Sequence, residues 1–118
     1  MAVKDVVGRY GEDLAVRALE GQGWEVVARN WRCAFGELDI VAWDGSDTVF
    51  VEVKTRRSDA FGGALAAVTP SKLRRLRRLA GEWLAAQDGH WPGVRIDVVA
   101  VTLPRSGPAV IEHLRGVE

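Results

Sequence analysis

The sequence has little of several residue types, and each shortage excludes a class of protein. It contains one cysteine and two histidines among 118 residues, so neither an internal disulfide nor a zinc site built from several thiolates can form. No apolar stretch is long enough for a membrane helix, and the first ten residues lack the apolar core and cleavage site of a signal peptide. We therefore expect a cytoplasmic protein in which Cys33 is a small buried apolar residue.

Low-complexity runs, internal repeats and an excess of one charge are also missing. Hydrophobic residues make up 47% and charged residues 27%, which is typical of a globular domain, and the length predicts one domain over residues 1–118. Sixteen basic residues balance sixteen acidic ones, so net charge gives no argument for nucleic acid. The basic residues nevertheless gather in two segments, with Lys54, Arg56 and Arg57 in one and Lys72, Arg74, Arg75, Arg77 and Arg78 in the other.

The second basic segment allows two interpretations. It is the solvent face of an amphipathic helix, or it contacts the phosphates of a nucleic acid. Like charges at helical spacing repel, and their uniform sign exceeds what solubility requires. We retain phosphate contact as a hypothesis, because such contacts give affinity without reading base sequence.

Hydrophobic periodicity predicts an alternating order of helices and strands. We expect helices over residues 5–22 and from Thr69-Pro70 to about 87, and strands over residues 24–32, 36–43, 48–56, 94–103 and 109–114. A helical connection between the third and fourth strands makes those two parallel, whereas hairpins join the first three. The predicted fold class is therefore α/β, with a mixed central sheet flanked by helices. Residues 58–63 are expected to form a connecting loop, whose Phe61-Gly-Gly63 tip could also close over a substrate.

Two consecutive predicted strands carry acidic residues within apolar sequence. Strand 36–43 contains Asp39, and strand 48–56 contains Glu52 and Lys54, which share one face because strand side chains alternate. The Cβ atoms of Glu52 and Lys54 would lie roughly 6.6 Å apart, close enough to serve one phosphate and one metal ion. A hairpin between the strands would bring Asp39 beside Glu52. These residue types predict a divalent-metal phosphodiesterase site.

The alternation also predicts which side chains of strand 36–43 are buried together. We expect Leu38, Ile40 and Ala42 to share one face, with Asp39 on the other. Glu37 points the same way as Asp39, and we expect it to be solvated or paired with an arginine.

The first helix offers a further acid. Glu12 precedes Ala15, Val16 and Leu19 at spacings of three, four and seven, so it borders the apolar stripe and is expected to point inward. An ordinary charge at the edge of a helix is the alternative.

Together these residues resemble the bacterial YraN-like family, an endonuclease-like group of the PD-(D/E)xK nuclease superfamily. The resemblance covers roughly residues 8 to 103 and is carried by Glu12, Gly36-Glu-Leu-Asp39 and Phe50-Val-Glu-Val-Lys54-Thr-Arg56. Leu38 stands where the motif has proline, a position at which the superfamily is loose. The superfamily, and in particular its archaeal Holliday-junction resolvases, implies a restriction-endonuclease-like sheet and a magnesium-dependent nuclease.

The resemblance also implies roles for individual residues. Asp39 and Glu52 match the metal-binding acids, Lys54 matches the motif lysine, and Glu12 matches the acid of the first helix. Mg²⁺ prefers oxygen ligands and keeps several waters, so we expect Asp39, Glu52 and the Val53 carbonyl to hold it, with Glu12 completing or orienting the shell and Mn²⁺ as an alternative ion. The basic residues expected to contact nucleic acid are Arg56, Arg57, Lys72, Arg74, Arg75 and Arg78.

The predicted function is therefore magnesium-dependent cleavage of structured or branched nucleic acid. We expect DNA, although the residues leave RNA open, and a junction substrate would favour a homodimer. One alternative is a non-catalytic nucleic-acid-binding or scaffold module that retains the nuclease fold. Another is a structural protein without nucleic-acid affinity. His90, His113 and Asp97 are expected to be structural, and the five tryptophans are expected to pack in the core or at its rim rather than to stack on bases.

Overall fold

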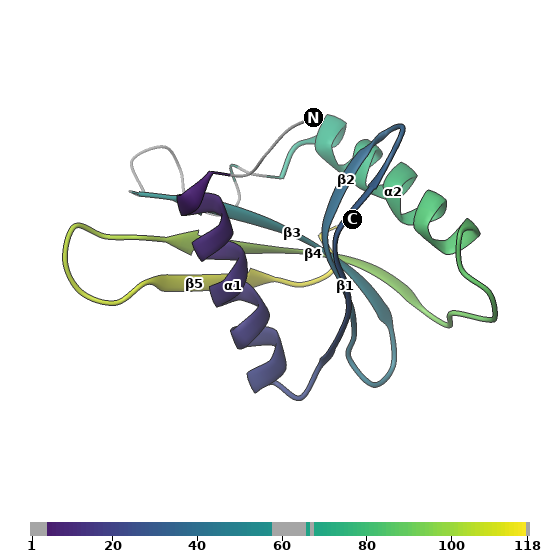
Figure 1. Cartoon of the computed structure of the whole chain (residues 1–118), viewed down its shortest axis with the longest axis horizontal. Helices are drawn as coiled ribbons and strands as arrows, with labels where there is room; N and C mark the ends of the chain where they lie inside the picture. The colour runs from purple at the N-terminus through teal and green to yellow at the C-terminus, as the bar shows by residue number, and fades with distance from the viewer. Residues whose placement is uncertain (1–4, 58–65, 67, 118) are drawn as a thin grey trace.

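The computed structural model describes residues 5–57, 66 and 68–117 (Figure 1). The helices and strands in this part of the chain are α1 (Val6–Gly21), β1 (Glu25–Cys33), β2 (Gly36–Trp43), β3 (Thr48–Arg56), α2 (Pro70–Ala85), β4 (Val94–Thr102) and β5 (Val110–Leu114). The five strands form one sheet in the order β1-β2-β3-β4-β5. Only β3 and β4 are parallel, and the other neighbours are antiparallel. The predicted mixed α/β sheet is confirmed, and the predicted loop tip at Phe61-Gly-Gly63 lies outside the described residues.

Both helices begin next to a side chain that caps them. The Asp5 side chain accepts a hydrogen bond from the Gly8 backbone at 2.7 Å, and the Thr69 side chain accepts one from Lys72 at 3.2 Å. Pro70 occupies the first turn of α2, where its missing N–H leaves no helical bond unmade. These caps fix the positions from which both helices approach the sheet.

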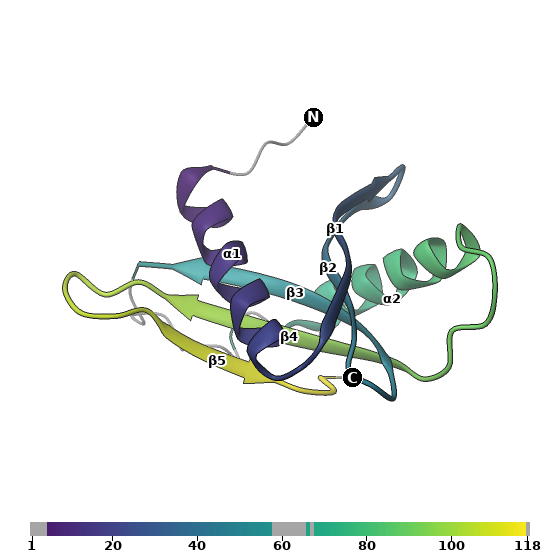
Figure 2. The same ribbon diagram turned by 60° about the horizontal axis from the view of Figure 1, so that its bottom comes forward.

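The two helices cover opposite faces of the sheet (Figures 1 and 2). On β3, Val49 and Val51 belong to the core that contains α1, whereas Phe50 belongs to the core that contains α2. Trp83 of α2 lies edge-on to the Phe50 ring, with centroids 5.8 Å apart. The period-two pattern of the strand therefore supplies both cores. Among the described residues, no helix combines the length and apolarity required to cross a membrane.

The expected face assignment on β2 is wrong for one residue. Ile40 and Ala42 pack in the α1 core, but Leu38 packs in the α2 core. The reason is that β2 bends. Its pairing with β3 ends at Ile40–Val51, while its pairing with β1 continues to the hairpin tip. Figure 2 shows the far end of this hairpin bending away from the plane of the remaining strands.

Candidate active site

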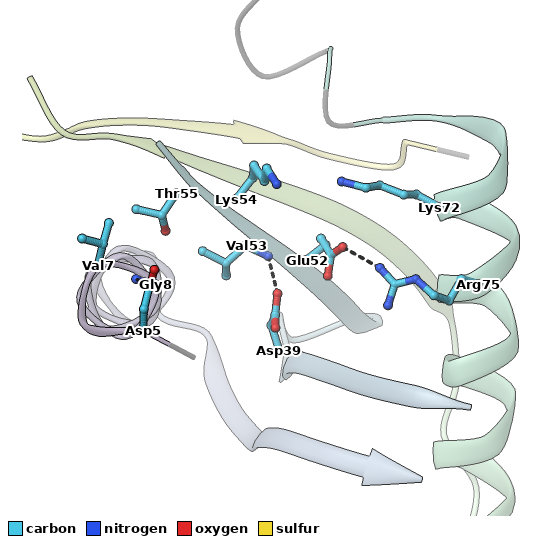
Figure 3. A pocket seen from close by; sticks show the side chains of 10 residues that line it. All are labelled: Asp5, Val7, Gly8, Asp39, Glu52, Val53, Lys54, Thr55, Lys72 and Arg75. Atoms are coloured by element: carbon cyan, nitrogen blue, oxygen red, sulfur yellow. Dashed lines mark hydrogen bonds and ion pairs between the residues drawn. The ribbon is translucent and has the colours of Figure 1, made fainter. Parts of the chain in front are cut away.

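A pocket of about 490 Å³ opens where β2 separates from β3. Its walls come from the start of α1, the middle of β2, the second half of β3 and the first half of α2 (Figure 3). The lining residues are Asp5, Val7, Gly8, Asp39, Glu52, Val53, Lys54, Thr55, Lys72 and Arg75. Three of the four predicted catalytic residues, Asp39, Glu52 and Lys54, are thus brought together.

Asp39 is the residue of β2 next to Ile40, where the pairing with β3 ends, and it is only 8% exposed. Its Oδ2 atom accepts a hydrogen bond from the Val53 backbone N–H at 2.8 Å. The carboxylate therefore replaces a ladder partner for β3 and is fixed in the pocket. Because the N–H and C=O of one strand residue point to the same edge, the Val53 carbonyl faces the same opening.

Glu52 lies on β3 beside Asp39, and its side chain is 13% exposed. Arg75 of α2 donates to its Oε2 atom at 3.0 Å. Burial and the neighbouring Asp39 carboxylate raise the pKa of Glu52 from 4.5 to about 7, against the lowering effect of Arg75 and Lys72. Two acids held side by side repel each other when both are charged, and a bound cation would relieve that repulsion.

Three basic side chains line the pocket together with the acids. Lys54 on β3 and Lys72 on α2 both line it, and Figure 3 shows their side chains extending toward each other. Arg75 on α2 is the third basic residue of the lining, and it donates a hydrogen bond to Glu52. Apart from Asp5, which caps α1, the pocket pairs two carboxylates with three basic side chains, an arrangement suited to a metal ion and a phosphate together.

Glu12 points inward as predicted and is 1% exposed, but it is not among the residues that line the pocket. Its Oε1 atom accepts bonds from Asn30 at 2.9 Å and from Arg29 at 3.1 Å. Within residues 5–57, 66 and 68–117, no three His, Cys, Asp or Glu side chains form a group able to hold a metal ion. Asp39 and Glu52 therefore form a pair of acids in the pocket, and Glu12 is buried outside its lining.

Helix α1 lies unusually close to β3 beside this acid. A Cβ atom added at Gly11 would come within 1.9 Å of the Thr55 Oγ1 atom, so only glycine permits this approach. The contact places the first turns of α1 at the wall of the pocket.

The other basic residues predicted to contact nucleic acid lie outside the pocket lining. These are Arg56, Arg57, Arg74 and Arg78. Arg78 places its guanidinium 3.7 Å from the centre of the exposed Phe35 ring at the tip of the β1–β2 hairpin. The basic run of α2 is therefore divided, with Lys72 and Arg75 at the pocket and Arg78 at the hairpin.

A second buried charged cluster surrounds Asp97 on β4. Arg95 donates two hydrogen bonds to the Asp97 carboxylate, at 2.9 and 3.1 Å, and His113 lies 2.7 Å from it. Arg95 also bonds Asp44 and Asp47 in the β2–β3 turn. The cluster ties β4, β5 and that turn together, which confirms the structural role predicted for Asp97.

Sequence reasoning missed several residues around the predicted acids. Arg29 and Asn30, which bond Glu12, carry no motif that would indicate this role. Gly11 and Thr55 were also overlooked, although a glycine inside a predicted helix often marks a close approach. The expected arginine partner of Glu37 is confirmed as Arg32, at 2.9 Å.

The fold and the pocket define a class of protein: an α/β protein of restriction-endonuclease-like architecture with paired acids where two strands diverge. The model of the Uncharacterised protein family UPF0102 matches residues 11–101, and the chain belongs to this family. The recognition of the YraN-like, nuclease-related group is thereby confirmed.

The similarity to several named proteins extends over nearly the whole chain. The UPF0102 protein of Beutenbergia cavernae is 62% identical over 117 residues, which cover 99% of each chain. That of Kineococcus radiotolerans is 61% identical over 97% of this chain and 94% of its own. That of Mycolicibacterium vanbaalenii is 59% identical over 94% and 92%, respectively.

Proposed function

We propose that this protein is a magnesium-dependent endonuclease that acts on structured or branched nucleic acid, with DNA as the expected substrate. The observation that carries the proposal is the pairing of Asp39 and Glu52 in one pocket, with Lys54 on the same wall and Lys72 and Arg75 opposite. Cleavage of a phosphodiester requires stabilisation of extra negative charge at the phosphate, and this set of residues offers both a cation site and direct positive charge.

The donor atoms suit Mg²⁺, with Mn²⁺ as a substitute. Both ions accept carboxylate and carbonyl oxygens, and Mg²⁺ is usually held by one or two carboxylates while keeping several waters. Asp39, Glu52 and the Val53 carbonyl would hold the ion. When bound, it supplies positive charge at the phosphate and lowers the pKa of a water ligand.

The chain's own residues bind and orient the substrate. Lys54 extends from the strand that carries Glu52, so its ammonium group would lie beside the scissile phosphate and stabilise the charge that develops there. Lys72 and Arg75 approach from α2 and would contact the phosphate from the opposite wall. Glu12 bonds Asn30 and Arg29 of β1, the strand that pairs with the Asp39 strand, and would help to orient the site from there.

Arg75 links substrate binding to the acids. Its guanidinium now bonds Glu52 at 3.0 Å, and it is 42% exposed, so it can turn outward without unfolding α2. Exchange of Glu52 for a phosphate oxygen as its partner would leave the Glu52 carboxylate for the metal ion. Arginine suits this exchange because its planar fork matches both carboxylate and phosphate.

The remaining basic residues would contact phosphates farther from the cut. Arg78 lies along α2 beyond Arg75, and Arg74, Arg56 and Arg57 add positive charge around the pocket. Such contacts give affinity that does not depend on base sequence and weakens steeply with salt. Cleavage of both strands of a branched substrate would require two such sites, and a homodimer supplies them.

A second candidate function is a non-catalytic nucleic-acid-binding module. The Arg75–Glu52 ion pair is the observation that favours it, because the pair neutralises one of the two acids without a metal ion. This module would bind nucleic acid and cut nothing.

Cleavage of labelled linear, flapped and four-way substrates, with Mg²⁺, Mn²⁺ or chelator, tests the proposal. Wild type is expected to cut in either metal, whereas Glu52→Gln is expected to fold, bind nucleic acid and not cut. Glu112→Gln is the matched control, since Glu112 is exposed on β5 away from the pocket. Binding without cleavage by wild type would support the second function, and absence of binding at low salt would exclude both.

A further inference from the structure

Asn30 has an unusual backbone conformation in the middle of β1. Its φ angle is +53°, and it is the one non-glycine residue with positive φ in the described part of the chain. Asparagine tolerates this left-handed region better than most residues, yet it is rarely found inside a strand. Such conformations persist where surrounding contacts hold them, and they concentrate at functional sites.

Asn30 lies directly across from Asp39. Arg29 pairs with Ile40, and Trp31 pairs with Leu38, so the residue between them on β1 faces the residue between them on β2. The unusual backbone and the proposed catalytic acid therefore occupy one rung of the same hairpin.

A hydrogen bond to a buried acid holds the exposed Asn30 in place. Its Nδ2 atom donates to the Glu12 Oε1 atom at 2.9 Å, and the Glu12 side chain is 1% exposed. Glu12 itself is fixed by α1, where the neighbouring Gly11 packs against Thr55 of β3. The conformation of β1 is thereby anchored to a helix that rests on the central strand of the pocket.

The bend of the β1–β2 hairpin begins where Asn30 faces Asp39. The β2–β3 pairing ends at Ile40–Val51, Asp39 is the first unpaired residue beyond it, and Leu38 packs on the opposite face from Ile40. β2 remains paired with β1 through this region, so a turn in β1 carries β2 with it. The resulting gap gives the Asp39 carboxylate access to the Val53 N–H at 2.8 Å.

We propose that Asn30 is a positioning residue of this site: its left-handed backbone, anchored on Glu12, separates β2 from β3 and sets the Asp39 carboxylate against the Val53 amide. The effect on Asp39 follows from the geometry alone. Its consequence for cleavage rests on the proposed nuclease function.

Three substitutions separate backbone conformation from the anchoring contact. Glycine in Asn30→Gly adopts positive φ freely, alanine in Asn30→Ala resists it, and aspartate in Asn30→Asp tolerates it but cannot donate to Glu12 when ionised. Arg32→Ala is the control, because it removes an ion pair nearer the tip of the same hairpin, between Arg32 and Glu37.

Two measurements report on Asp39 itself and on catalysis. Hydrogen exchange of the Val53 amide, followed by NMR, reports the bond to Asp39 and is independent of activity. Single-turnover cleavage and KM report catalysis, with folding of each variant checked by its melting temperature. A displacement of about 1 Å at a catalytic group can lower the rate on the order of 100-fold.

We expect Asn30→Ala to lose Val53 protection and on the order of 100-fold in cleavage rate, with KM nearly unchanged. Asn30→Gly should retain most of both, Asn30→Asp should lose both in part, and Arg32→Ala should match wild type. If Asn30→Ala does not fold, loss of Val53 protection in Asn30→Asp is the deciding result.

Val53 protection unchanged in Asn30→Ala and Asn30→Asp would overturn the proposal, as would equal losses in Asn30→Gly and Asn30→Ala. If wild type cuts nothing but Val53 protection follows the expected order, the positioning role holds and the nuclease function fails. Metal-dependent cleavage that none of the three substitutions affects would support the nuclease function and contradict the positioning role.

Discussion

Two five-residue segments of this chain are almost the same in sequence and differ in chemistry. Leu38-Asp-Ile-Val-Ala42 lies on β2 and Ile96-Asp-Val-Val-Ala100 lies on β4, so each places one aspartate within an apolar strand. Both aspartates are buried, at 8% exposure for Asp39 and 0% for Asp97. Burial and local sequence therefore do not distinguish the two.

Their neighbours do distinguish them. Asp97 receives hydrogen bonds from Arg95 and the Gly116 backbone and lies against His113, and these contacts lower its pKa although burial alone would raise it. Asp39 lies against a second acid, Glu52, whose pKa rises to about 7 through burial and this repulsion. An acid surrounded by donors stabilises the fold, whereas an acid beside another acid is prepared to bind a cation.

Removal of the Asp39 carboxylate should lower catalysis strongly, whereas removal of the Asp97 carboxylate should hardly affect it. We expect Asp39→Asn to lower the metal-dependent cleavage rate on the order of 1,000-fold, because the metal ion loses a charged ligand. Asp97→Asn should leave the cleavage rate of the folded protein close to that of wild type. Single-turnover rates well below both melting temperatures make the comparison, and equal losses in the two variants would contradict it.

For the free energy of unfolding, Asp97 should be the more important of the two aspartates. Asp97→Ala removes the buried acceptor of Arg95, His113 and the Gly116 N–H, and because Arg95 keeps Asp44 and Asp47 we expect a cost of about 3 kcal/mol of unfolding free energy, the lower end for a broken buried ion pair. Urea unfolding measures this loss. Asp13→Ala is the control, because it removes an ion pair with Arg29 in which Asp13 is 53% exposed and should cost at most about 1 kcal/mol. A cost for Asp97→Ala as small as that of the control would show that the cluster is dispensable.

The pH dependence of stability should distinguish the two sites as well. The folded protein raises the pKa of Glu52 from 4.5 to about 7, so between these values it retains a proton that the unfolded chain releases. Stability must then fall as pH rises through this range, by up to about 3 kcal/mol at 1.36 kcal/mol per pKa unit. Urea unfolding of wild type and Glu52→Gln across this range should show the difference, and parallel curves would refute it.

Asp97 should give a pH dependence of stability of the opposite sign in the same experiment. Its pKa is lowered in the folded protein, so its stabilising contribution is complete above the unfolded value of 3.8 and is lost as pH falls. The stability difference between wild type and Asp97→Asn should therefore shrink in acid.

The smallest expected effect concerns the basic wall of the pocket. Lys72→Ala should weaken nucleic-acid binding about tenfold and reduce the slope of log affinity against log salt by about 1, because one phosphate contact is lost. Arg77→Ala removes the same charge from the same helix, but Arg77 lies beside Ala80 and Leu84, outside the pocket. Titrations at several salt concentrations measure both, and equal slopes in the two variants would mean that Lys72 makes no specific contact.

Much of the fold could be predicted because it depends on local patterns. Alternation along β3 puts neighbouring residues such as Val49 and Phe50 on opposite faces, and the predicted helix starts at residue 5 and at Thr69-Pro70 agree with the observed caps. The prediction failed at Leu38, where alternation was assumed to continue through a bend. No local pattern announces that bend, because it depends on Asn30, whose backbone is held by a residue 18 positions away on α1.

The candidate site was predictable in its members and less so in their arrangement. Asp39, Glu52 and Lys54 meet in the pocket because adjacent strands bring them together, which follows from strand order alone. Glu12 was correctly predicted to be buried, but its partners depend on the angle at which α1 crosses the sheet. The partner of Glu52, Arg75, comes from a helix whose distance from β3 depends on the packing of the α2 core.

The order of helices and strands, the two faces of β3 and the strands on which the acids lie follow from local sequence, because periodicity and caps act over a few residues. Packing in three dimensions brought Arg75 against Glu52, and His113 and the β2–β3 turn against the Arg95–Asp97 pair. The physical reason is that the charge state of a buried carboxylate depends on groups within a few ångströms in space, and in both clusters some of these groups come from distant parts of the chain.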